Sequence, residues 1–161
     1  MSDELIQEFC QDVRAILEEL SPLIDSIEFK NTRPGDLESF GQKVDRIMGA
    51  AKSLGYESIG TISELCKAVS YKASQSQDPN LVRIVTGILA EALEALSVLV
   101  KSLENNGTEL SDDPQVLAIC SRLNFLQNKL AFIQRSSVAV DDPELAKITI
   151  SRDELNKSKQ S

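Results

Sequence analysis

The side chains of this sequence that could carry chemistry are carboxylates, amides and three cysteines, because its 161 residues include no histidine. Without histidine there is no serine–histidine or cysteine–histidine nucleophile pair and no conventional zinc site. The sequence also has no glycine-rich phosphate loop of the Walker or dinucleotide-binding type. We therefore predict a protein that has no catalytic residues, no bound metal and no cofactor.

The three cysteines, Cys10, Cys66 and Cys120, are far apart and form no CxxC pair. We interpret them as small buried hydrophobic residues of a protein in a reducing compartment. The chain begins with Met1-Ser2-Asp3-Glu4, which is acidic where a signal peptide would be basic. No apolar run approaches the roughly 18 residues that a membrane-spanning helix needs. These features predict a soluble, cytoplasmic protein.

The composition favours helices and excludes two classes of partner. Apolar residues make up 42% of the chain and aromatic residues only 4%, with no tryptophan, so the core must consist mainly of Leu, Ile, Val and Ala. The formal net charge is −8 and the pI is about 4.6. A chain this acidic is repelled by nucleic acid and by anionic membrane surfaces, so we expect neither as a partner.

Apolar residues recur every three or four positions in five segments, which is the spacing of amphipathic helices. No strand-like alternation of any length appears before the tail. The sequence therefore predicts an all-α chain with one helical domain over residues 1–135 and a polar, flexible tail over 136–161. The five predicted helices cover about residues 2–27, 36–54, 57–73, 79–104 and 114–135.

Local chemistry marks the ends of these helices. Asp36, and the Asp-Pro pairs that begin at Asp78 and Asp113, are predicted N-caps. Gly55 is predicted to end the second helix, and Asn105-Asn106-Gly107 the fourth. Residues 30–35 form a predicted loop. Ser21-Pro22 should either kink the first helix or start a new one.

The second predicted helix carries an unusual exposed face. Its apolar stripe, from Leu37 to Leu54, leaves Asp45 on the solvent side. By the three-and-four spacing rule, Asp45 shares this side with neighbouring residues that include two glycines. Each glycine costs about 1 kcal/mol relative to alanine inside a helix, and the close approach of a partner would compensate that cost. The predicted binding residues are Gly41, Asp45, Met48, Gly49 and Lys52.

Residues 44–55, Val-Asp-Arg-Ile-Met-Gly-Ala-Ala-Lys-Ser-Leu-Gly, resemble the motif of the histidine-containing phosphotransfer (HPt) family, roughly His-x-Leu-Lys-Gly-Ser/Ala-x-x-x-Leu-Gly. Asp45 stands in the histidine position and Met48 in the lysine position. Gly49 and the small residues after it keep the rest of the pattern. The resemblance covers about residues 3–104 and implies a four-helix bundle of HPt type, to which this chain adds a fifth, C-terminal helix.

The resemblance also implies a function. In HPt proteins the glycine of the motif lets a receiver domain approach, and an imidazole nitrogen takes and releases the phosphoryl group. The Asp45 carboxylate is a weak nucleophile and would meet an acidic receiver pocket with like charge. We therefore expect a non-catalytic pseudo-HPt signalling module, which binds a receiver domain or a related two-component partner without phosphotransfer.

The fifth predicted helix has a second apolar face. Its main stripe runs from Val116 to Ile133, yet Ala118, Phe125 and Phe132 project to nearly the opposite side. One buried face cannot accommodate both sets. We expect a second interface there, made by a homodimer, by another partner or by the tail, and among these we favour the homodimer.

Two other functions fit the sequence. Some phosphatases of response regulators are helical bundles in which an acid and an amide position the attacking water, and such groups occur at Asp153, Glu154 and Asn156 and at Gln127 or Asn128. Alternatively, the chain is a structural or adaptor bundle unrelated to phosphorelay. In that case, changes at Gly41, Asp45 and Gly49 would leave its interactions intact.

Overall fold

The computed structural model of the chain describes residues 3–29, 34–76 and 78–136, and it describes side chains over 4–27, 35–76 and 78–131. These residues form five helices and no strand, which confirms the predicted all-α fold. The helices are α1 (Asp3–Phe29), α2 (Pro34–Leu54), α3 (Glu57–Ser74), α4 (Pro79–Asn106) and α5 (Pro114–Ser136). None of the described helices combines the length and the apolar character that crossing a bilayer requires.

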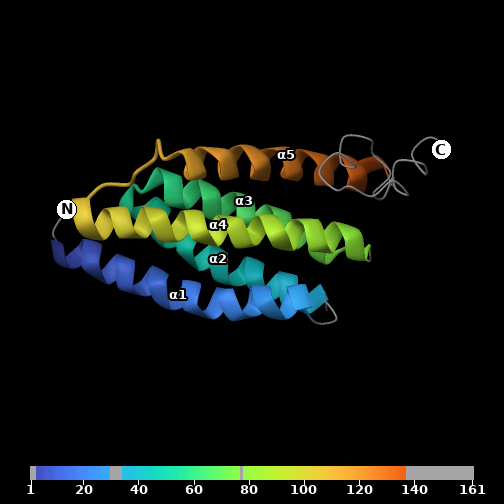
Figure 1. The fold of residues 1–161 in the computed structure, drawn as a ribbon, viewed down its shortest axis with the longest axis horizontal. Helices are drawn as coiled ribbons and strands as arrows, with labels where there is room; N and C mark the ends of the chain where they lie inside the picture. Colours follow the sequence, from blue (N-terminus) through green and yellow to red (C-terminus); the bar gives the residue numbers. More distant parts are fainter. Residues whose placement is uncertain (1–2, 30–33, 77, 137–161) are drawn as a thin grey trace.

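The first four helices lie side by side as a bundle, and the fifth lies along one side of it (Figure 1). In the bundle α1 packs on α2 and α4, and α3 packs on the same two helices. Among the described residues α5 contacts α3 and α4 but neither α1 nor α2. The outer sides of α1 and α5 therefore form opposite surfaces of the molecule (Figure 1).

The core is built from the predicted apolar stripes. The stripes of α2, α3 and α4 are buried as predicted, apart from Leu54, which is partly buried against the core. Removing one such side chain from water contributes about 1.5–3 kcal/mol. The buried stripe of α1 begins later than predicted, at Phe9, because Leu5 is 40% exposed. The largest fully buried side chains are Leu20, Leu37, Phe40, Ile47, Ile59, Ile62, Leu89, Leu96, Leu99, Leu103, Leu123 and Leu126.

Most predicted helix ends are also confirmed. The Asp78 carboxylate accepts hydrogen bonds from the backbone N–H groups of Asn80 and Leu81, and Asp113 caps α5 in the same way. Gly55 and Gly107 have φ angles of 83° and 76°, the left-handed conformation that ends a helix most easily at glycine.

One predicted boundary is wrong, and one of the two alternatives at Pro22 is excluded. Helix α2 starts at Pro34, not after Asp36, because proline has no N–H to lose in the first turn of a helix. Asp36 instead places its negative charge in that first turn, where the helix dipole favours it. Helix α1 does not restart at Pro22. Pro22 is exposed, while buried Leu20 and Ile24 on either side hold this part of the helix against the bundle.

The start of α3 is capped by a residue from a distant part of the chain. Its own N-cap residue, Tyr56, makes no side-chain capping bond. The Glu109 carboxylate, in the connection between α4 and α5, accepts hydrogen bonds from the backbone N–H groups of Ser58 at 3.2 Å and Ile59 at 2.7 Å. The hydroxyls of Ser58 and Ser111 are also bonded, at 2.6 Å. These bonds anchor the connection that leads into α5.

Replacing Glu109 with alanine should therefore lower the free energy of unfolding by about 1 kcal/mol, a typical value for a lost helix cap. Urea unfolding followed by circular dichroism measures this change. Asp112→Ala removes the same charge from an exposed neighbouring position and is the matched control. Equal losses in the two variants would show that Glu109 does not act as a cap.

Candidate functional site

The antiparallel pair α2 and α3 organises the candidate site, and a glycine lies at each end of their contact. A Cβ atom on Gly41 would lie 2.8 Å from Ser70 Oγ and 3.3 Å from the Tyr71 ring. A Cβ atom on Gly60 would lie 3.0 Å from Lys52 Cγ. The missing side chains thus let the two helices come close.

The position of Gly41 corrects the sequence prediction. Gly41 is buried and faces α3, so it does not belong to the exposed face around Asp45. The helical projection took the apolar stripe as the whole buried side of α2, whereas α3 covers a wider arc that includes this glycine. The close approach for which we expected a partner at Gly41 is made by α3.

Asp45 is 44% exposed and forms an ion pair with Lys67 of α3, with 2.8 Å between Lys67 Nζ and Asp45 Oδ1. This hydrogen bond is the main cause that raises the pKa of Lys67 above its ordinary value. The pair therefore contributes stability below the unfolded lysine's pKa, and the contribution is lost as the pH rises through the higher folded pKa. A second pair, Lys52 with Glu64 at 3.0 Å, joins the same two helices.

Four of the five predicted binding residues do share an exposed surface. Asp45 and Met48 are partly exposed, while Gly49 and Lys52 are exposed. No atom lies within 4 Å of where a Cβ on Gly49 would be. We call these four residues the α2 face.

A groove of about 500 Å³ adjoins the α2 face. It brings together an acid, Glu64 of α3, an amide, Gln127 of α5, and apolar surface from α2 and α3. Apart from Met48, the motif itself indicates none of these residues. Lys67 could have been identified from the sequence as the partner of Asp45. In an antiparallel helix pair, residues equally far from the connecting turn lie opposite each other, and both residues are equally far from Tyr56 in the turn between α2 and α3. The lining residues are Met48, Glu64, Leu65, Lys67, Ala68, Tyr71 and Gln127.

The second predicted surface, on α5, also faces away from the core. Ala118 is exposed and Phe125 is 39% exposed, with Lys129 Nζ 5.7 Å from the centre of the Phe125 ring. Leu117 lies on the same side and is 55% exposed. The side chain of Phe132 lies outside the described residues, as do Asp153, Glu154, Asn156 and the rest of the tail.

The cysteines are packed into the fold. Cys10 and Cys66 are buried, as predicted, and Cys120 is partly buried against the core. Burial raises the pKa of all three thiols, which disfavours the reactive thiolate. Among the described residues no group of three or more carboxylate or cysteine side chains is arranged to hold a metal ion.

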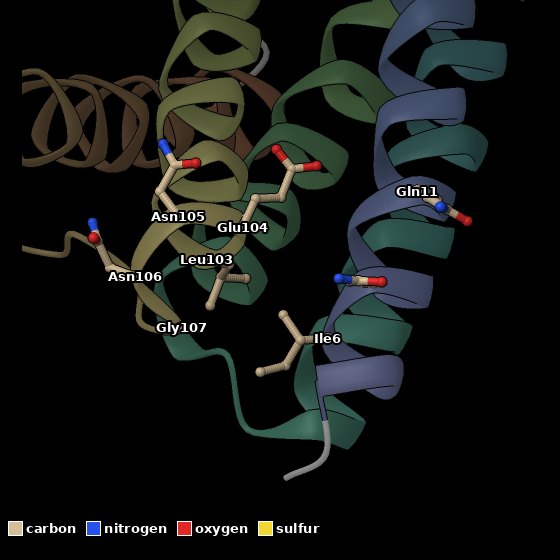
Figure 2. A pocket seen from close by; sticks show the side chains of 8 residues that line it. Ile6, Gln11, Leu103, Glu104, Asn105, Asn106 and Gly107 are labelled. Atoms are coloured by element: carbon tan, nitrogen blue, oxygen red, sulfur yellow. The ribbon is translucent and has the colours of Figure 1, made fainter.

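A further hollow of about 560 Å³ lies between the start of α1 and the end of α4 (Figure 2). Figure 2 shows Ile6 and Leu103 pointing toward one another between the two helices, while Asn105 and Asn106 project from the other side of α4. Glu104 is the titratable group in its lining, and Arg14 engages it through a bidentate ion pair that lowers the pKa of the Glu104 carboxyl. This hollow therefore presents amides and apolar surface rather than a reactive group.

Alanine at the two α2 glycines should change stability in opposite directions. Gly49→Ala should raise the free energy of unfolding by about 0.5–1 kcal/mol, because alanine favours the helix and meets open space. In Gly41→Ala the new methyl group would push the Ser70 hydroxyl off its hydrogen bond to the Lys67 carbonyl. Overpacking of this kind costs about 1–3 kcal/mol, which exceeds the helix gain. Denaturant unfolding measures both changes, and equal stabilisation would contradict the tight contact at Gly41.

No family model, curated protein or solved structure matches this chain.

Proposed function

We propose that this chain is a pseudo-HPt module that binds a receiver domain through the α2 face without phosphotransfer. The observation that carries the proposal is the position of Gly49. Like Gly87 of α4 it is an open glycine inside a helix, but it follows Met48 of the groove and shares its face with the Asp45–Lys67 ion pair. This glycine costs its helix about 1 kcal/mol relative to alanine, yet no neighbouring atom in the described chain needs the space. A partner that approaches the backbone at this point accounts for that cost.

The chemistry of Asp45 favours binding over transfer. Its carboxylate is a weak nucleophile and is already held by Lys67. The same ion pair reduces the electrostatic problem of docking, because Lys67 places positive charge beside Asp45. An acidic receiver pocket would then meet a locally balanced surface instead of an isolated negative charge.

The adjoining groove supplies the apolar part of the interface. Met48, Leu65, Ala68 and Tyr71 contribute to its lining, and Glu64 and Lys67 lie among them. Apolar contacts among polar and charged groups are the usual anatomy of a protein interface. Gly41 is excluded from this surface, so the proposed binding residues are Asp45, Met48, Gly49 and Lys52, joined by Lys67.

Titration of the chain with receiver domains from the same organism, with and without a phosphoryl mimic, tests the proposal. Gly49→Arg should weaken binding by about tenfold or more, since the new side chain blocks the approach. Gly87→Arg is the matched control, because Gly87 is also inside a helix, α4, and also faces open space. The proposal fails if no receiver binds, or if the two arginines weaken binding equally; an adaptor bundle unrelated to phosphorelay would then be the better account.

A receiver phosphatase is the second candidate function, because the groove brings Gln127 of α5 and Glu64 of α3 into one lining. An acid and an amide at the same site could orient a water molecule toward a phosphorylated aspartate. Glu64 is engaged by Lys52, which leaves the amide of Gln127 as the more direct group to vary.

Under this second function, Gln127→Ala should slow the loss of phosphate from a phosphorylated receiver by about tenfold or more, since positioning groups of this kind contribute factors of about 100. Asn128→Ala is the matched control, because Asn128 is the exposed neighbouring amide and does not line the groove. Phosphate release is measured directly. An unchanged rate in Gln127→Ala would exclude the phosphatase and is what the binding module predicts.

A further inference from the structure

The outer side of α5 presents apolar surface that the bundle does not cover. Leu117 and Phe125 are 55% and 39% exposed, and Ala118 and Ser121 lie on the same exposed side. Among the described residues, four large hydrophobic side chains are notably exposed, and these two share one face of one helix. A clustered pair of this kind indicates a contact surface more than scattered single residues do.

The charge of α5 indicates what can cover this surface. The helix contains Arg122, Lys129 and Arg135 and no acidic residue, so its own net charge is +3, although Arg122 is paired with Glu91 of α4. A symmetric dimer that joins α5 to α5 would place two such basic helices against each other. The like charges therefore disfavour the α5-to-α5 homodimer, and an acidic surface is the favoured occupant.

Helix α1 has such a surface. It contains eight acidic residues and one arginine, so it carries −7 of the chain's net charge of −8. Its outer side also bears small residues such as Ala15 and Ser21, which let another helix approach. The exposed acidic side chains are Glu4, Glu8, Asp12, Glu18, Glu19 and Asp25.

These complementary faces cannot meet within one molecule, because α1 and α5 lie on opposite sides of the bundle and do not contact each other in the described chain (Figure 1). They match in size: 27 and 23 residues correspond to helices of about 40 Å and 35 Å at about 1.5 Å per residue. A second copy of the chain can supply the missing partner.

We propose that the outer face of α5 binds the outer face of α1 of a second copy of this chain. Because the two faces differ, the contact is head-to-tail, and each copy keeps one face open for a further copy. The overall charge of −8 repels copies at long range, but at about 0.15 M salt charges more than about 8 Å apart are largely screened. Contacts between the two faces act within that distance.

Sedimentation velocity on the full-length chain over a range of concentrations tests the proposal. Two variants each remove one face at exposed positions: Phe125→Glu on α5, and the double change Glu8→Lys with Asp12→Lys on α1. The wild type should assemble at about 0.1 M salt and dissociate at about 0.5 M, where screening is stronger. The self-association of each variant alone should be weaker than that of the wild type by about tenfold or more. An equimolar mixture of the two should form a dimer, since each supplies the face that the other lacks.

A control separates local complementarity from net charge. Glu38→Lys with Glu57→Lys changes the net charge as much as the α1 variant does, but at exposed positions on α2 and α3. It should assemble at least as well as the wild type. Circular dichroism confirms that every variant is folded. A monomeric wild type, a mixture that does not form dimers, or an α1 variant that associates like the wild type would overturn the proposal.

Discussion

The fold and its candidate site depend on how closely α2 approaches α3. Gly41 and Gly60 leave room at this contact, because a methyl group at either position would press on a side chain of the opposite helix. With the helices this close, Asp45 reaches Lys67 and Lys52 reaches Glu64. Packing and charge pairing thus specify the same antiparallel arrangement of the two helices.

This arrangement separates two glycines that look equivalent in the sequence. Gly41 lies inside the contact between α2 and α3, where a side chain would press on Ser70 and Tyr71. Gly49 lies two turns further along α2, in open space, where the helix would be more stable with alanine. A residue that lowers stability without an internal reason is what a binding surface is expected to retain. The proposed function depends on this difference.

Features that repeat along a helix could be predicted from the sequence. The buried stripes of α2 to α4, the caps at Asp78 and Asp113 and the helix ends at Gly55 and Gly107 follow from spacing and local chemistry, and the structure confirms them. Pro34 was misjudged because proline was taken as part of the loop, whereas the first turn of a helix tolerates it. At Pro22 the alternative of a new helix start is excluded, since α1 continues through this exposed position.

Features that depend on distant parts of the chain could not be predicted in this way. The Glu109 cap on α3 joins residues about fifty positions apart, and nothing in the local sequence at Tyr56 indicates it. The burial of Gly41 needs the position of α3, which a projection of α2 alone does not contain. The groove likewise appears only when Gln127 of α5 is placed beside α3. The sequence predicted four residues of the exposed α2 face correctly. The contact with α3 excludes the fifth, Gly41.

The central claim is that the surface for a partner is the α2 face, next to the α2–α3 contact. Nuclear magnetic resonance tests it most directly, by following the backbone amide shifts of the full chain as a receiver domain is added. The account predicts that the largest changes centre on Asp45, Met48, Gly49 and Lys52 and extend to Lys67, while the outer sides of α1 and α5 change little. Changes confined to α1 or α5, or no changes with any receiver, would contradict it.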